Sequence, residues 1–260
     1  MLLKINPDNP EGRKIRQAVD LLEEGGVIIY PTDTVYAFGC DMMNVRAGDR
    51  ICRLRGLDPV KARLSLIFEA ISQVSEFTQQ IDNQTFKVLR KNLPGPFTFV
   101  LNSNNQVPKL FKNRKRTIGV RIPSNNIAMA LVKELGRPML TASLRSVDEI
   151  MEYFTDPIDI YEDYKKLVDL VIDGGIGGNR ASTVVDCTGG EPVVIREGVG
   201  LLEVCRHVST SARRHVGTLA RWHVVHWTFD VRPADVRLST CSRSARDFLL
   251  NGFSTILPGI

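Results

Sequence analysis

The sequence predicts an α/β protein of mixed character, with a central sheet that is partly parallel, partly antiparallel and flanked by helices. Short apolar runs alternate along the chain with segments whose apolar residues recur at helical spacing, which is typical of a sheet covered by helices. Proline and glycine separate several neighbouring runs, which favours antiparallel pairing in part of the sheet. With 260 residues, 43% of them hydrophobic, the chain can build a full core.

The first half of the chain begins with a helix and continues into a buried strand. Asn9 and Pro10 suit the N-cap and first position of a helix whose apolar residues are Ile15, Ala18, Val19 and Leu22. Gly25 and Gly26 end that helix, residues 27–30 form a buried strand, and Pro31 ends the strand. A loop is expected from there to residue 41, followed by a helix capped by Asn44, a strand over 64–68, a helix over 82–92 and a strand over 97–101.

The second half continues the alternation. A helix capped by Asn125 and ended by Gly136 is the clearest element. The glycine-rich segment 173–178 lacks the Gly-Lys-Ser/Thr ending of a nucleotide-binding P-loop, so it is interpreted as a turn. The expected strands cover residues 117–122, 138–143, 167–172, 182–186 and 193–196.

Composition excludes several classes of protein. No run reaches 18 apolar residues, and the N-terminus lacks the apolar stretch of a signal peptide, so neither a membrane span nor export is expected. The five cysteines form no Cys-x-x-Cys pair, which favours free thiols and a cytoplasmic location. Because residues 1–204 contain no histidine, Ser-His-Asp chemistry and zinc-type metal sites are excluded there, and no protein-bound metal is expected.

Composition changes abruptly near residue 204, which divides the chain into a body (1–204) and a tail (205–260). The tail holds eight arginines, no lysine and three aspartates, which accounts for the whole net charge of +5. All four histidines and both tryptophans also lie there. A partly disordered, frame-shifted or read-through end is one interpretation, and a genuine basic RNA-binding extension is the other.

Hydroxyl and carboxylate side chains follow directly after the predicted strand 27–30. Thr32 and Thr34 flank Asp33 where the strand ends, and hydroxyls at a strand end of an open α/β sheet lie where ligands usually bind. A turn stabilised by these same side chains is the alternative.

Several arginines lie where an anion would suit them. Arg121 interrupts the apolar strand 117–122, and a buried guanidinium is costly without an anionic partner. Arg53 and Arg55 follow the hydroxyl-rich loop, and a guanidinium can bind phosphate or carboxylate through two hydrogen bonds, although a solvated helix face is the alternative. The basic run Lys112, Arg114, Lys115 and Arg116 would attract phosphate, with a solvated loop as the alternative.

The run PTDTVYAFGCD (31–41) resembles the PTDTVYGLGCD signature of the YrdC/YciO family, with Ala37-Phe38 in place of Gly-Leu. TIGVRIP (117–123), TAS (141–143), STVVD (182–186) and VIREG (194–198) resemble further family motifs, up to about residue 203. The run PGPFT (94–98) belongs to the same pattern and is interpreted as structural. The resemblance implies a twisted mixed sheet with an open concave face. It also implies synthesis of threonylcarbamoyl-adenylate from L-threonine, bicarbonate and ATP with Mg²⁺, for the N6-threonylcarbamoyl modification of adenosine in tRNA.

The resemblance also carries site residues onto this chain. The family's Lys, Arg, Ser and Asn tetrad corresponds to Arg53, Arg55, Thr141 and Ser143 as catalytic residues. The threonine contacts carried over are Thr32, Thr34, Arg121 and Ser182. The nucleotide contacts carried over are Arg55, Thr117, Thr141 and Arg196.

Three of the four tetrad positions depart from the synthase pattern, and the pattern here is that of the YciO branch. Serine in place of asparagine at Ser143 loses an amide that can both donate and accept hydrogen bonds. Two functions therefore remain open. One is a threonylcarbamoyl-adenylate synthase, and the other is a regulatory or double-stranded RNA- or tRNA-binding relative that uses the run 112–116 and has weak or no synthase activity.

Overall fold

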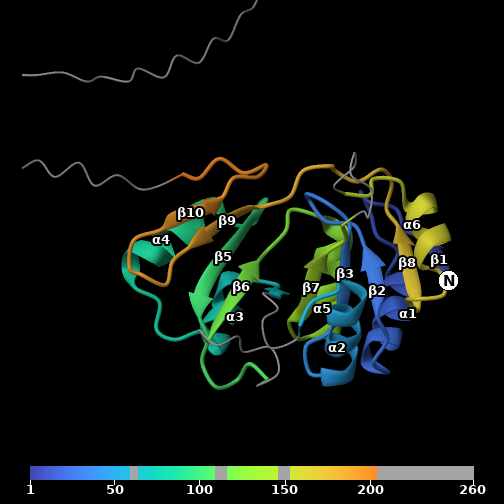
Figure 1. Cartoon of the computed structure of the whole chain (residues 1–260), viewed down its shortest axis with the longest axis horizontal. Helices are drawn as coiled ribbons and strands as arrows, with labels where there is room; N and C mark the ends of the chain where they lie inside the picture. The colour runs from blue at the N-terminus through green and yellow to red at the C-terminus, as the bar shows by residue number, and fades with distance from the viewer. Residues whose placement is uncertain (59–63, 109–115, 146–152, 204–260) are drawn as a thin grey trace, which may run out of the picture. The chain divides into compact units, whose positions relative to one another are not determined.

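The computed structural model describes residues 1–58, 64–108, 116–145 and 153–203, which fold around a ten-stranded mixed sheet (Figure 1). The strand order is β1-β8-β2-β3-β7-β4-β6-β5-β9-β10. The predicted tail from residue 205 onward, together with Lys112, Arg114 and Lys115 of the basic run, lies outside the described residues.

The strands are β1 (Leu2–Lys4), β2 (Ile28–Tyr30), β3 (Ala37–Asp41), β4 (Ser65–Ile67), β5 (Phe97–Asn102), β6 (Thr117–Arg121), β7 (Met139–Ser143), β8 (Leu170–Asp173), β9 (Thr183–Asp186) and β10 (Val193–Arg196). The helices are α1 (Gly12–Glu23), α2 (Val45–Leu54), α3 (Ile71–Phe77), α4 (Asn83–Asn92), α5 (Asn126–Leu135) and α6 (Pro157–Tyr164).

The sheet mixes parallel and antiparallel pairs, as the sequence predicts. The pairs β1–β8, β2–β8, β4–β6 and β5–β9 are parallel. The pairs β2–β3, β3–β7, β4–β7, β5–β6 and β9–β10 are antiparallel. The predicted fold class is therefore confirmed, and residues far apart in the sequence meet on neighbouring strands.

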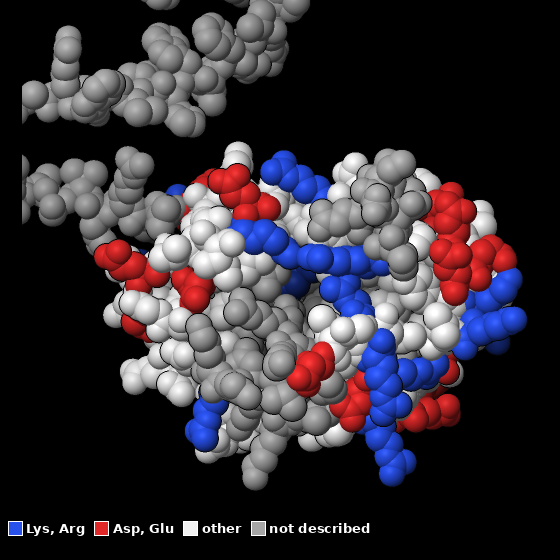
Figure 2. Space-filling view, viewed as in Figure 1, with Lys and Arg blue, Asp and Glu red and all other residues white. Residues whose placement is uncertain are grey.

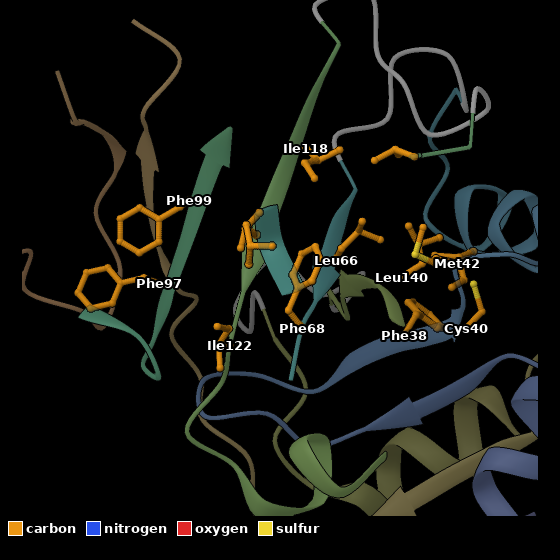
Figure 3. Close-up of a cluster of buried hydrophobic side chains, with 14 of the residues drawn as sticks. Phe38, Cys40, Met42, Leu66, Phe68, Phe97, Phe99, Ile118, Ile122 and Leu140 are labelled. Atoms are coloured by element: carbon orange, nitrogen blue, oxygen red, sulfur yellow. The ribbon is translucent and has the colours of Figure 1, made fainter. Parts of the chain in front are cut away.

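Different helices lie beside the two ends of the sheet. Figure 1 shows α1, α2, α5 and α6 beside the β8–β2–β3 end, and α3 and α4 beside the β5–β9–β10 end. One apolar cluster joins α1 and α5 to buried residues of β2, β7 and β8. A second cluster extends from β5 across β6 and β4 to β3, with Phe99, Leu66 and Phe38 among its members (Figure 3).

Side-chain caps place most helix starts as predicted. The carboxamide oxygens of Asn44 and Asn125 accept from the backbone N–H of Ala47 and Ala128, which begins α2 and α5. Gly136, with φ of 70°, ends α5 in the left-handed conformation that glycine adopts at low cost.

The predicted start of the first helix at Asn9 and Pro10 is wrong. Asn6 Oδ1 accepts from the N–H groups of Asp8 and Asn9, which folds residues 6–9 into a turn instead. Glu11 is the N-cap residue of α1, and its carboxylate accepts from the backbone N–H of Asn6. The helix therefore begins at Gly12.

The predicted loop over 31–41 is only half correct. Residues 31–36 reverse the chain, but Ala37–Asp41 form β3, which pairs with both β2 and β7 and is buried along its whole length. A Cβ on Gly39 would lie 2.8 Å from the Tyr30 ring, so glycine lets the two strands pack closely. The sequence also failed to predict β1, α3 and α6, which are between three and eight residues long.

Candidate ligand-binding site

A cavity of about 520 Å³ lies on the sheet face formed by β7, β4, β6, β5 and β9. That volume is within the usual range for small-molecule sites. Figure 2 shows Lys and Arg side chains gathered across the middle of the face in view, beside a hollow. Three arginines line the cavity, namely Arg55, Arg121 and Arg196, together with one carboxylate, Asp186.

The cavity floor follows the two-residue period of the strands, because alternate side chains of a strand point to the same face. Thr117, Gly119 and Arg121 of β6 line it at alternate positions, as do Thr98 and Val100 of β5, and Ile118 also reaches the lining. Gly119 is required by close packing, since a Cβ there would lie 2.4 Å from Ser65 Oγ and 3.1 Å from Thr98 Cγ2. Because Gly119 has no side chain, the centre of the cavity floor stays open.

On one side of the cavity, Arg121 forms a buried ion pair with Asp33. Its Nη2 lies 2.8 Å from Asp33 Oδ1, and the two side chains are only 6% and 7% exposed. The same nitrogen donates to Thr34 Oγ1 at 3.2 Å, and Asp33 Oδ2 accepts from the backbone N–H of Ser124. Arg121 Nε is buried without a hydrogen-bond partner among the described residues. The guanidinium is thus held firmly while keeping N–H capacity for an anion.

The hydroxyls of the signature loop form a short directed chain. Thr32 Oγ1 donates to the carbonyl of Val35 at 2.7 Å and accepts from the backbone N–H of Thr34 at 3.1 Å. Because the only hydrogen of Thr32 Oγ1 is used in this way, the 3.1 Å contact with Thr34 Oγ1 must be donated by Thr34. Both hydroxyl hydrogens are therefore committed within the protein, and they fix the loop that holds Asp33.

Thr141 belongs to a second hydroxyl chain beside the first. Its Oγ1 donates to the Phe38 carbonyl at 3.2 Å and lies 2.7 Å from the hydroxyl of Tyr30, which donates to it. Burial raises the pKa of Tyr30, so the phenol keeps its proton at neutral pH. While these two hydrogen bonds persist, the Thr141 hydroxyl can accept a hydrogen bond from a ligand but cannot donate one.

Arg55 approaches the cavity from the C-terminal end of α2. Its Nη1 donates to the carbonyl oxygen of Ser143, and its buried Nε has no partner among the described residues. Burial lowers the pKa of Arg55, and the nearby charge of Arg145 lowers that pKa further. The partly buried guanidinium of Arg55, with the charge of the exposed Arg145 nearby, is suited to an anionic ligand.

The opposite side of the cavity is formed by β9 and the edge strand β10. Ser182 Oγ lies 2.8 Å from Thr98 Oγ1. Arg196 Nη2 donates to the carbonyl of Ser182 at 2.8 Å and to its Oγ at 3.3 Å. A register shift between Val194 and Arg196 marks a β-bulge, and both Ile195 and Arg196 line the cavity. Such a bulge can turn a side chain toward a site that the regular alternation would miss.

The cavity brings together most of the residues singled out from the sequence: Thr34, Arg55, Thr117, Arg121, Thr141, Ser143, Ser182 and Arg196. Thr32 lies behind this lining and contacts it through Thr34. Arg53 is exposed in the last turn of α2 and is not among the lining residues. Arg116 is exposed, and its carbonyl accepts from Ser103.

Sequence reasoning missed several residues that shape the cavity. Asp33 was noted in the signature but given no role, and Thr98 was interpreted as structural within the PGPFT run. Tyr30, Ser65 and Gly119 were also overlooked as parts of the site. The alternation of Thr117, Gly119 and Arg121 was a usable signal for the floor, whereas the contact between Thr98 and Ser182 depends on a long-range strand pairing.

The described residues contain no group of three His, Cys, Asp or Glu side chains that could hold a metal ion. Likewise, none of the helices in the described part of the chain is long and apolar enough to cross a membrane.

Comparison with known proteins agrees with this fold and cavity. A family model named Sua5_yciO_yrdC, described as "Telomere recombination", matches residues 20–198. The "Uncharacterized protein YciO" of Escherichia coli (strain K12) is 44% identical over 198 residues, which cover 75% of this chain and 94% of that protein. The threonylcarbamoyl-AMP synthase of Pyrococcus abyssi is 30% identical over 205 residues, covering 78% of this chain and 59% of the synthase.

Solved structures show the same likeness. The crystal structure of E. coli YciO aligns with a TM-score of 0.73 at 41% identity, covering 78% of this chain and 98% of that one. The structure of P. abyssi Sua5 complexed with L-threonine aligns with a TM-score of 0.69 at 28% identity, covering 76% of this chain and 57% of that one.

The fold and the cavity define an α/β protein with a cationic, hydroxyl-lined pocket on one face of a mixed sheet. The match over residues 20–198 and the 44% identity to YciO then identify the family. This chain belongs to the Sua5/YciO/YrdC family.

Proposed function

We propose that this cavity binds L-threonine and ATP together and that the protein makes threonylcarbamoyl-adenylate from threonine, bicarbonate and ATP. The observation that carries the proposal is the convergence of Arg55, Arg121 and Arg196 on one cavity, whose lining includes a single carboxylate among the described residues. A carboxylate and a triphosphate are both anions, and fixed guanidinium groups suit both. The relationship to a threonylcarbamoyl-AMP synthase and to a Sua5 solved with L-threonine supports the choice of substrates.

In the proposed reaction, the amine of threonine and bicarbonate form a carbamate with loss of water. A carbamate oxygen attacks the α-phosphorus of ATP, a new P–O bond forms, and the bond to pyrophosphate breaks. The protein contributes mainly by positioning the two anions and stabilising the charge of the transition state. Arg121 is proposed to hold the threonine carboxylate, because it is buried and anchored by Asp33. Arg55 and Arg196 are proposed to contact the nucleotide.

Mg²⁺ would enter this reaction as a partner of the triphosphate. Mg²⁺ usually binds through one or two carboxylates, several waters and substrate phosphates rather than in an all-protein cage. Asp186 is the one carboxylate among the residues that line the cavity, and its Oδ1 already accepts from Thr188. This donor set fits an ion carried by ATP, which would neutralise charge on the phosphates. A cytoplasmic location is proposed as well, since the described cysteines Cys40, Cys52 and Cys187 are all free thiols.

The test is pyrophosphate formation by the full chain with Mg-ATP, bicarbonate and each of several amino acids. The proposal predicts pyrophosphate that depends on threonine and bicarbonate and disappears in Arg121→Met. Thr78→Val is the matched control, because Thr78 is buried and its hydroxyl binds Val74 away from the cavity. Absence of pyrophosphate with every amino acid, together with salt-sensitive tRNA binding, would overturn the synthase and favour the RNA-binding relative.

A further inference from the structure

Thr98 and Ser182 share a hydroxyl contact at the floor of the cavity. Their oxygens are 2.8 Å apart, and both side chains are buried, with 7% and 4% of their surface exposed. Thr98 lies on β5 and Ser182 directly precedes β9, and in this parallel pair Phe97 is opposite Thr183 and Thr98 is opposite Val184. The contact therefore depends on the pairing of two strands about 85 residues apart in the sequence.

The two hydroxyls carry two hydrogens, and only one of them can lie between the two oxygens. No other acceptor for the second hydrogen exists among the described residues, since the remaining contact of the pair is a donation from Arg196 Nη2 to Ser182 Oγ. This differs from Thr34 and Thr141, whose hydrogens are taken by Thr32 and by the Phe38 carbonyl. The buried pair therefore has an unused hydrogen-bond donor beside the cavity, and buried donors are normally satisfied.

Either hydroxyl can donate in the 2.8 Å contact, and one of the two arrangements leaves the free hydrogen on Ser182. Ser182 Oγ receives Arg196 on one lone pair, which leaves one lone pair for Thr98. When Thr98 donates to that second lone pair, both lone pairs of Ser182 Oγ are occupied. The hydrogen of the Ser182 hydroxyl then has no acceptor within the pair and can be donated to a ligand.

We propose that Thr98 is a positioning residue of this site: its hydroxyl donates to Ser182 Oγ and thereby directs the Ser182 O–H to an acceptor oxygen of the amino-acid ligand. The inference rests on the proposed function, in which the ligand is L-threonine. It assigns Thr98 to amino-acid recognition and not to the nucleotide, and it makes the PGPFT run part of the binding machinery.

The test is isothermal titration of the full chain with L-threonine and, separately, with Mg-ATP. Thr98→Val keeps the shape of the side chain but removes the hydroxyl, and it should weaken threonine binding about tenfold, as expected for one lost hydrogen bond. Thr98→Ser keeps the hydroxyl and should restore threonine affinity to within about twofold of the native chain. ATP affinity should be the same in all three proteins. Thr78→Val makes the same chemical change away from the cavity and should leave both affinities unchanged.

Three results would overturn the inference. Native threonine affinity in Thr98→Val would show that the hydroxyl is dispensable while leaving the proposed function intact. Equal losses in Thr98→Val and Thr98→Ser, or a parallel loss of ATP affinity and melting temperature, would show that Thr98 acts only through packing. If the native chain bound no threonine with or without Mg-ATP, the proposed function would fail, and the inference would fail with it.

Discussion

The two sides of the cavity are built in opposite ways. On the signature side, β2 and β3 are buried at every residue, and the side chains of Thr32, Asp33, Thr34 and Arg121 bind one another. On the other side, β10 is exposed at every residue and forms the edge of the sheet. Among the described residues, Arg196 hydrogen-bonds there only to Ser182, and the Thr98–Ser182 pair keeps one unused hydrogen.

The difference indicates that the two sides contribute to ligand binding in different ways. A buried network whose side chains bind one another fixes its groups before a ligand arrives, which lowers the ordering cost of binding. An exposed edge strand with few buried contacts opens at low free energy and can adjust around the ligand. We therefore expect the signature side to determine both stability and binding, and the β9–β10 side to affect binding with little effect on stability. Three substitutions and one labelling experiment, taken from the largest expected effect to the smallest, probe that expectation.

Replacing Arg121 by Met should have the largest effect, because it leaves the Asp33 carboxylate buried without its cation. Removing one partner of a buried ion pair costs roughly 3–5 kcal/mol of unfolding free energy. Urea denaturation should show this loss, and titration should show no threonine binding. The double variant Asp33→Asn with Arg121→Met should regain part of the stability but not the binding. Unchanged stability in the single variant would contradict the description of this side as a tightly coupled network.

Gly119→Ala places a methyl group at the centre of the floor, between the two sides. Its Cβ would lie 2.4 Å from Ser65 Oγ, so overpacking should cost about 1–3 kcal/mol of unfolding free energy and reduce the affinity for ligand. Adding Ser65→Gly should recover much of the stability, because it removes the atom that clashes. Gly12→Ala is a suitable control, because a Cβ at Gly12 would have nothing within 4 Å. Gly56→Ala would be a poor control, because Gly56 has a φ of 63°, which strains any other residue.

Arg196→Met should separate binding from stability. The side chain is exposed at the sheet edge, so the change should alter the unfolding free energy by about 0.5 kcal/mol or less. Affinity for Mg-ATP should fall at least about tenfold, because the change removes the charge-assisted hydrogen bond to phosphate that we propose for Arg196. A melting temperature that falls as far as in Arg121→Met would remove the contrast between the two sides.

The smallest expected effect is a difference in alkylation rate between two buried thiols, one on each side of the cavity. Burial raises the pKa of Cys187 at the end of β9 to about 12, and it raises the pKa of Cys40 in β3 as well. At pH 8 both thiols are protonated in the native state, so alkylation requires opening of the structure to expose the thiolate. Iodoacetamide labelling followed by peptide mass spectrometry should modify Cys187 faster than Cys40. Equal rates would show that both sides open together.

The sequence was sufficient for the elements whose signals are local. The caps Asn44 and Asn125 and the αL glycine Gly136 act on groups within a few residues, so the helices α2 and α5 were predicted correctly. The buried arginine in an apolar strand also pointed to a site, since the cost of burying Arg121 does not depend on knowing its partner.

The remaining features depend on pairings that a single sequence does not contain. Glycine in Ala37–Asp41 suggested a loop, but Gly39 is there because Tyr30 packs against it across the β2–β3 pair. Thr98 looked structural because its partner Ser182 is reached only through the β5–β9 register. The start of α1 shifted to Gly12 because a competing turn at Asn6 uses the N–H of Asn9.

Hydrogen exchange measured by mass spectrometry, with and without L-threonine and a non-hydrolysable ATP analogue, tests the division between the two sides most directly. Without ligand, backbone amides of Val193–Arg196 should exchange quickly, and those of Ile28–Tyr30 and Ala37–Asp41 should exchange slowly. With both ligands, protection should increase across β9 and β10 and stay constant on the signature side. Protection that increases only in β2 and β3, or nowhere, would contradict the account.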